Sequence, residues 1–109
     1  MISLAQALDA LGAPLPGVIR ISDTVNVMEF DGAGEETQVV PAGAKYVLID
    51  VSGQADVYVS TSGTAEVPAG DVTDGSASAL APELRQIGGA THISVAAAAA
   101  CSVTLAYYG

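Results

Sequence analysis

The chain has 109 residues, enough for one domain that buries a core, and half of them are hydrophobic. Its 12 acidic residues outnumber the 3 basic ones and give a net charge of −9, which argues against nucleic acid and anionic membranes as partners, because phosphate binding requires clustered lysine and arginine. The single cysteine excludes an internal disulfide and a cysteine-type zinc site, and no apolar run approaches the roughly 18 residues of a membrane-spanning helix.

The first residues predict a short amphipathic helix. Its leucines, Leu4, Leu8 and Leu11, recur at the spacing of one helical face, and a glycine and two prolines follow them. A helix this short is marginal alone in water, so the leucine stripe must dock, either on its own domain or on a neighbouring subunit. We therefore divide the chain into a helical arm with its linker, residues 1–16, and a β domain, residues 17–109.

From residue 17 onward the sequence is rich in β-branched residues and turn signals. Strands are predicted at Val18–Ser22 and Thr24–Phe30. The second of these changes its apolar face after Val27, which indicates a bulge or a strand buried on both sides. Asp31–Gly34 predicts a turn, and a short strand follows at Thr37–Val40.

One turn sequence occurs twice. The residues Val40–Gly43 (Val-Pro-Ala-Gly) predict a type I turn, with proline in the second position and glycine in the fourth. The same residues recur at Val67–Gly70. Because the sequences after the two copies diverge, we interpret them as two uses of one turn and not as an internal repeat.

The middle of the chain predicts two strands and a long loop. Ala44–Ser52 has apolar side chains on both faces, which favours a central position in a sheet. Ala55–Thr61 alternates between apolar and polar residues, so Tyr58 is expected to point outward. The following region, Thr61–Glu83, is rich in Gly, Ser, Thr and Asp, and a loop this long in a small domain is usually functional or mobile.

Three more strands are predicted at Leu84–Ile87, Thr91–Ala96 and Cys101–Tyr108, and the alanines before Cys101 predict a tight crossing between the last two. Apolar residues at alternate positions place one face of the last strand in the core. Seven or eight short strands, spaced by about ten residues, predict an all-β fold of the β-sandwich or jelly-roll kind.

Residues with catalytic potential are few. His92, the only histidine, alternates with apolar neighbours and is predicted to be exposed, with Ser94 as the one nucleophile near it in sequence and no orienting group evident. Cys101 lies on the apolar face of the last strand and is predicted to be buried and inert. We therefore assign no catalytic, cofactor-binding or metal-binding residue and do not expect an enzyme.

Two acidic turns, Asp31–Glu36 and Asp71–Gly75, could hold calcium by composition. Neither has the EF-hand spacing, in which ligands alternate and a bidentate Glu closes the loop. We interpret both as solvated turns, because Asp and Gly favour turns for backbone reasons. Asp71 and Asp74 nonetheless remain candidates for contacts with a partner.

Four segments, residues 40–47, 71–76, 88–95 and the closing Ala-Tyr-Tyr-Gly, resemble small β-sandwich virion proteins of tailed bacteriophages. These are the capsid decoration (cement) proteins and the head-fibre or spike-base proteins. The resemblance implies a multimer, often a homotrimer, that is assembled in the host cytoplasm and fixed to the capsid exterior. The implied partners are the major capsid protein and sister subunits, with no cofactor and no catalytic residue to carry over.

Two functions from different classes follow. The first is a structural virion protein that decorates the outer head surface, with the leucine arm or the Thr61–Glu83 loop contacting the capsid or sister subunits. The alternative is a carbohydrate- or receptor-binding module of a phage fibre or tail, which would use Tyr58 and the same loop. The lack of tryptophan counts against the alternative, because sugar sites rely on aromatic surfaces.

Overall fold

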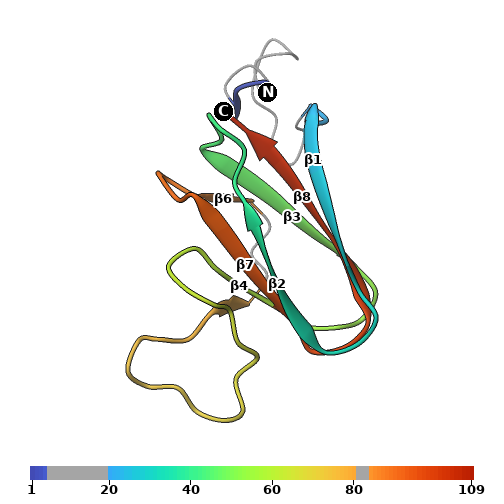
Figure 1. Ribbon diagram of the computed structural model, residues 1–109, viewed down its shortest axis with the longest axis vertical. Coiled ribbons are helices and arrows are strands. Elements are labelled where there is room, and N and C mark those ends of the chain that lie inside the picture. The colour runs from blue at the N-terminus through green and yellow to red at the C-terminus, as the bar shows by residue number, and fades with distance from the viewer. Residues whose placement is uncertain (5–19, 81–83) are drawn as a thin grey trace.

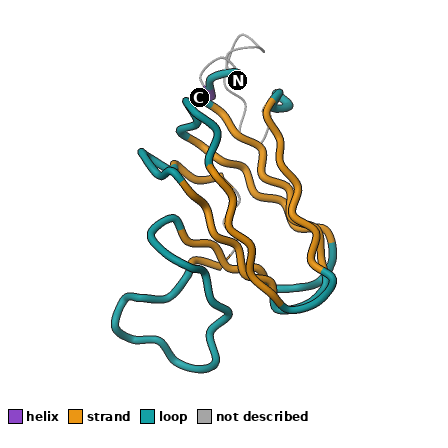
Figure 2. The backbone as a smooth tube through the Cα atoms, in the orientation of Figure 1, coloured by secondary structure: helices purple, strands orange, loops and turns teal. Residues whose placement is uncertain are grey.

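The computed structural model describes residues 1–4, 20–80 and 84–109 (Figures 1 and 2). The described part forms two four-stranded antiparallel sheets packed face to face. Their strands are β1 (Thr24–Phe30), β2 (Gly34–Val39), β3 (Tyr46–Ser52), β4 (Val57–Ser60), β5 (Ala79–Leu80), β6 (Leu84–Gln86), β7 (His92–Ala97) and β8 (Cys101–Tyr108).

The strand order identifies the fold as a jelly roll. The first sheet has the order β1-β8-β3-β6 and the second the order β2-β7-β4-β5. The pairs β1–β8, β2–β7, β3–β6 and β4–β5 are those of one long antiparallel hairpin. Rolling that hairpin into two layers adds the contacts of β3 with β8 and of β4 with β7. The predicted all-β sandwich is therefore confirmed.

Where this hairpin passes from one sheet to the other, backbone hydrogen bonds continue to pair its two arms. At the crossing, Val40 N donates to Thr91 O and Ile87 N donates to Lys45 O, each over 2.8 Å. The first bond extends the β2–β7 pairing, and the second extends the β3–β6 pairing. The two crossing segments thus satisfy each other's backbone groups, which loops at a sandwich edge otherwise leave to water.

The core lies between the sheets and consists largely of aliphatic side chains. The predicted inward face of β8 is confirmed, since its side chains there are at most 8% exposed. β3 is central, as predicted, because it pairs with both β8 and β6. The core cluster comprises Met28, Phe30, Val40, Ala44, Val47, Ile49, Val57, Val59, Ile87, Ile93, Val95, Ala97, Cys101, Val103, Leu105 and Tyr107.

The predicted change of face in β1 is wrong. Its register with β8 runs without interruption from Thr24 to Phe30, so these residues contain no bulge. Val25 and Val27 lie on the outer face and are 45% and 53% exposed, whereas Met28 is 1% exposed. The strand therefore carries apolar side chains on both faces although only one face is buried. The exposed valines produced the apparent change of face in the sequence.

Two other strand boundaries differ from prediction. The described residues of the expected strand Val18–Ser22 do not form one, and the buried Ser22 hydroxyl instead donates to Tyr107 O over 2.5 Å. β2 begins at Gly34, where a turn was predicted, because Gly34 already pairs with Ala97. That pairing also draws the first alanines of the predicted crossing into β7, and the crossing itself follows them.

The two Val-Pro-Ala-Gly sequences fold differently, and the first is not a type I turn. Ala44 N donates to Pro41 O over 3.1 Å, and Gly43 has a φ of 87°, so the turn begins at Pro41 and is of type II. Val40 lies just before the turn, where its N–H donates to Thr91 O and extends the pairing of β2 with β7. In the second copy Gly70 adopts a φ outside the positive region, so the two sequences are not two uses of one turn.

This difference gives a paired test. Gly43→Ala should lower the free energy of unfolding by about 1 kcal/mol, because an L-residue is strained at this positive φ. Gly70→Ala should change it by less than about 0.5 kcal/mol, because that backbone suits alanine and no atom lies within 4 Å of the added Cβ. Urea denaturation of both variants measures the contrast, and equal effects would contradict the turn assignment.

Candidate functional site

The outer face of the second sheet carries a row of hydroxyl groups. The strand register places Thr37 of β2 beside Ser94 of β7, and Ser94 beside Ser60 of β4. Cross-strand partners share a face, so all three side chains point away from the core. Ser94 is nevertheless only 1% exposed, which means that another part of the chain covers it.

That cover is the start of the long loop, residues 61–78. Ala65 N donates to Ser94 Oγ over 2.8 Å, and Ser94 Oγ donates to Glu35 Oε1 over 2.7 Å. Thr37 Oγ1 donates to the same carboxylate oxygen over 2.5 Å. Through these bonds Ser94 holds the loop backbone against the sheet and ties it to the edge strand β2.

The bonds favour the ionised form of the carboxylate. The hydroxyl of Thr37, and then that of Ser94, hold the pKa of Glu35 below its ordinary value, because both donate to the ionised form. The Ser94 proton is directed at Glu35 and its oxygen accepts from the backbone of Ala65, so this serine connects the loop to β2.

The two titratable residues considered from the sequence lie as predicted. His92 is exposed, and its Nδ1 is 2.9 Å from the hydroxyl of its neighbour Thr91. Cys101 is buried, and burial raises the pKa of its thiol, which disfavours the reactive thiolate.

A hollow of about 300 Å³ opens beside the covered serine. Most of its lining residues have polar side chains, with several hydroxyls and one imidazole that can both donate and accept hydrogen bonds. The lining residues are Thr37, Thr61, Ser62, Gly63, Thr64, Thr91, His92 and Ser94. Sequence analysis missed this site, although Ser94 between Ile93 and Val95 in a buried strand was a signal of a polar group that needs partners.

Asp71 and Asp74, predicted as interaction residues, are exposed in the loop 61–78. Asp74 Oδ1 accepts hydrogen bonds from Ser76 N at 3.1 Å and Ser76 Oγ at 2.6 Å, and these bonds lower its pKa. Among the residues that the structure describes, no group of three or more His, Cys, Asp or Glu side chains could hold a metal ion.

Tyr58 is half-buried and not freely exposed as expected. It lies on the outer face of the second sheet, where its register partners are Leu80 of β5 and Ala96 of β7. A half-buried tyrosine offers less flat surface for stacking on a sugar than the exposed one that the sequence suggested.

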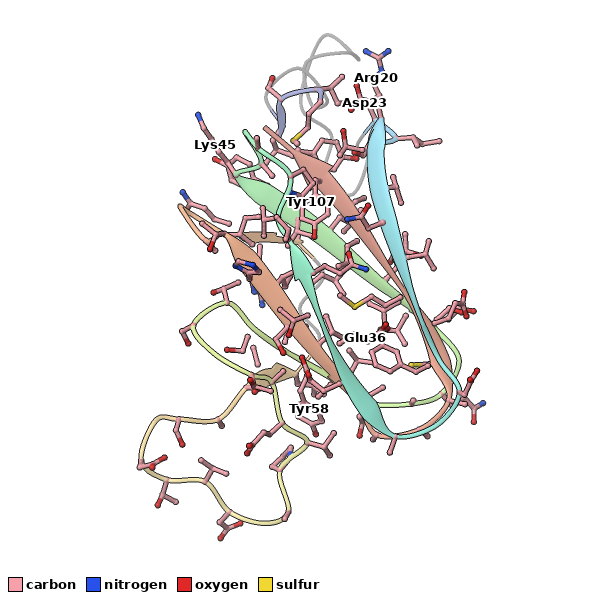
Figure 3. All side chains as sticks on the ribbon, in the orientation of Figure 1. Arg20, Asp23, Glu36, Lys45, Tyr58 and Tyr107 are labelled. Carbon is pink, nitrogen blue, oxygen red and sulfur yellow. The ribbon has the colours of Figure 1, made fainter. Side chains whose placement is uncertain are left out.

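The predicted N-terminal site is only partly described. Leu4 N donates to Gly109 O over 2.8 Å and Gly109 N donates to Ile2 O over 2.9 Å, so the first residues are bonded to the last. Leu8 and Leu11 lie outside the described residues. Figures 1 and 3 place the termini, with Arg20 and Lys45, at one end of the molecule and the loop 61–78 at the other, so the described N-terminal residues lie far from that loop.

Ser94 provides a test of how the loop is held. Ser94→Ala should lower the free energy of unfolding by about 1–3 kcal/mol, because it leaves the buried N–H of Ala65 without an acceptor. Ser60→Ala, in the same row but bonded only to exposed groups, should have little effect.

The same variant should raise the pKa of Glu35 in a carboxyl NMR titration. A depressed folded-state pKa contributes stability that is present above the unfolded pKa and is lost as pH falls through the folded value. Ser94→Ala should therefore also weaken the acid sensitivity of stability. An unchanged Glu35 titration would contradict the bond.

In the described residues, no helix has the length and apolar character needed to cross a membrane. No family model matches the chain, and searches of curated proteins and of solved structures found no significant similarity. The resemblance to phage virion proteins therefore stays a prediction.

Proposed function

We propose that this chain is a structural virion protein of a tailed bacteriophage, a decoration (cement) protein on the outer surface of the head. Its partners would be the major capsid protein and sister subunits, and its role would be to stabilise the shell through contacts and not to catalyse a reaction. The observation that carries the proposal is a rigid jelly roll from which one long acidic loop projects.

Two further observations support this function. Jelly rolls are a recurrent architecture of viral capsid proteins, an argument from fold analogy that also covers lectins. The charge of −9 would repel packaged DNA, which favours a place outside the shell over one inside it.

The loop 61–78 is the surface best suited to meet the capsid. It bears Glu66, Asp71 and Asp74, whereas the nearest basic residues in sequence are Lys45 and Arg85. Two exposed valines stand among these carboxylates, Val67 at 40% and Val72 at 43% exposure. Exposed valines flanked by carboxylates would fit a partner surface that has an apolar centre with basic residues around it.

A charge reversal tests this contact. Asp71→Lys should weaken binding to purified heads of the encoding phage by about tenfold, and wild-type binding should weaken as salt rises. Asp50→Lys, with the same change of charge on the exposed outer face of the first sheet, should bind as wild type does. Co-sedimentation with heads measures both.

The outcome that contradicts the proposal is a folded wild-type chain that stays in the supernatant at every salt concentration. Mass spectrometry of purified virions gives a second check that does not depend on recombinant protein, because a decoration protein must be present in the particle.

The hydroxyl-lined hollow beside Ser94 favours a second function, recognition of a glycan by a fibre or tail module. Hydroxyl and imidazole groups match the donors and acceptors of a sugar, and a hollow of about 300 Å³ admits a small ligand. The half-buried state of Tyr58 weighs against tight binding by stacking.

A glycan array separates the two functions. If the hollow is a sugar site, wild type should bind a defined subset of glycans and Thr61→Val should reduce that signal by about tenfold, because it removes a lining hydroxyl while keeping the shape. Ser102→Ala, on the other sheet, serves as the control. Wild type that binds no glycan removes this candidate and leaves the structural one untouched.

A further inference from the structure

The sandwich has four edge strands, and they are not equally protected. In the described part of the chain β1 and β6 border the first sheet, and β2 and β5 border the second. An edge strand presents unpaired N–H and C=O groups to which another chain can add. Proteins block such edges with short strands, prolines, bulges, lysines or charges that point inward.

Three of the four edges carry such a block. Within the residues that the structure describes, β5 has two residues and β6 has three. In β6, Arg85 lies opposite the buried Val47, so its charge is on the core side of the sheet. In β2, Glu36 lies opposite the buried Val95, so a carboxylate is also directed inward at that edge.

The edge formed by β1 has none of these features. It is seven residues long, reads Thr-Val-Asn-Val-Met-Glu-Phe, and contains no proline, lysine or arginine. Its register with β8 is regular over its whole length. Val25 and Val27 stay exposed on its outer face. On its inner face the side chains at 28 and 30 are apolar and buried, and those at 24 and 26 are uncharged and half-buried. Such a strand is suited to extend its sheet.

We propose that a second copy of this chain pairs with β1, antiparallel, to join the two first sheets into one continuous sheet. The pairing is twofold symmetric about Val27, so Val27 of each copy lies beside Val27 of the other. Thr24 then pairs with Phe30 of the second copy, and all seven residues of β1 are used.

Three constraints select this register. A slip by one residue would place the inward side chains of one copy on the outer face of the other, which the pleat forbids. A twofold axis at Asn26 would set Glu29 against Asp23 of the second copy, and like charges directly opposite destabilise a pair. With the axis at Val27, Glu29 lies opposite Val25, and the strands overlap completely.

This pairing names the surface through which sister subunits would contact each other. Its role in the virion rests on the proposed function. The pairing yields a twofold dimer in place of the threefold arrangement that the resemblance implies. Because each copy carries a charge of −9, the copies repel one another at long range, and their association should strengthen as salt screens that repulsion. The capsid contact through the acidic loop has the opposite salt dependence.

Sedimentation velocity of the full-length chain, without capsids, tests the pairing. Wild type should show a concentration-dependent dimer whose fraction rises between about 0.05 and 0.5 M NaCl. Val27→Lys should raise the dimer dissociation constant by at least about tenfold, because it sets two ammonium groups side by side. Val39→Lys, at an exposed valine on the edge strand β2, is the matched control and should dimerise as wild type does.

Cysteine cross-linking tests the register independently of any destabilised variant. Val27→Cys alone should form an intermolecular disulfide under mild oxidation, because cross-strand partners lie at disulfide distance. Val25→Cys should cross-link only when mixed with Glu29→Cys. Wild type, whose single thiol is buried, should form no cross-link.

Several results would overturn the proposal: a wild type that is monomeric at every concentration and salt, a dimer unaffected by Val27→Lys, or cross-linking at Val39→Cys in place of Val27→Cys. None of them bears on the capsid contact, because a monomer that co-sediments with heads would still be a decoration protein. Conversely, a salt-strengthened dimer that ignores heads would keep the pairing and reject the decoration function.

Discussion

The structure depends on the backbone pairing of β8 along both of its sides. β8 is bonded to β1 on one side and to β3 on the other, and its inward side chains form the middle of the core. Its last residues also hold the segments beyond the sheet, since Tyr108 O accepts from Lys45 N and Gly109 O accepts from Leu4 N. β1 pairs with β8, the last strand in sequence, so that Thr24 lies opposite Tyr107. The first sheet can therefore form only through contacts between residues that are far apart in sequence.

Small side chains on β7 allow the start of the loop 61–78 to pack on the outer face of the second sheet. Ser94 is small enough for the backbone of Ala65 to reach its hydroxyl, and Ala65 itself becomes 2% exposed. A larger residue at position 94 would displace the loop. An apolar residue there would leave the N–H of Ala65 without an acceptor. The base of the projecting loop and the hollow beside it therefore both depend on Ser94, which also joins Thr37 in lowering the pKa of Glu35.

The alternation of apolar and polar residues predicted most of the strands and their buried faces. It predicted few of the features that depend on contacts between residues far apart in sequence. The buried face of β8, the central place of β3 and the sandwich class follow from apolar periodicity within single strands. The turn at Pro41 was predicted one residue too early, because the glycine at 43 fits the fourth position of a type I turn as well as the third position of a type II turn, and the bond from Ala44 N to Pro41 O selects the second. The outer face of β1 was misjudged because valine favours strands whether or not it is buried, and the Ser94 connection needs Glu35 and Ala65, which only the fold brings to it.

The chain's acidity shapes how its sheets end. With three basic residues in all, it cannot protect its edges with lysines, which is the commonest device. β2 uses Glu36 and β6 uses Arg85, each directed toward the core side, while β5 is too short to template a partner. Each device costs packing at a sheet margin, which a domain with few aromatic side chains can bear at only a few positions. β1 instead retains Met28 and Phe30 as core residues, and an inward charge at either position would remove one of the largest side chains from a small core. At this end of β1, protection by an inward charge would therefore cost core stability.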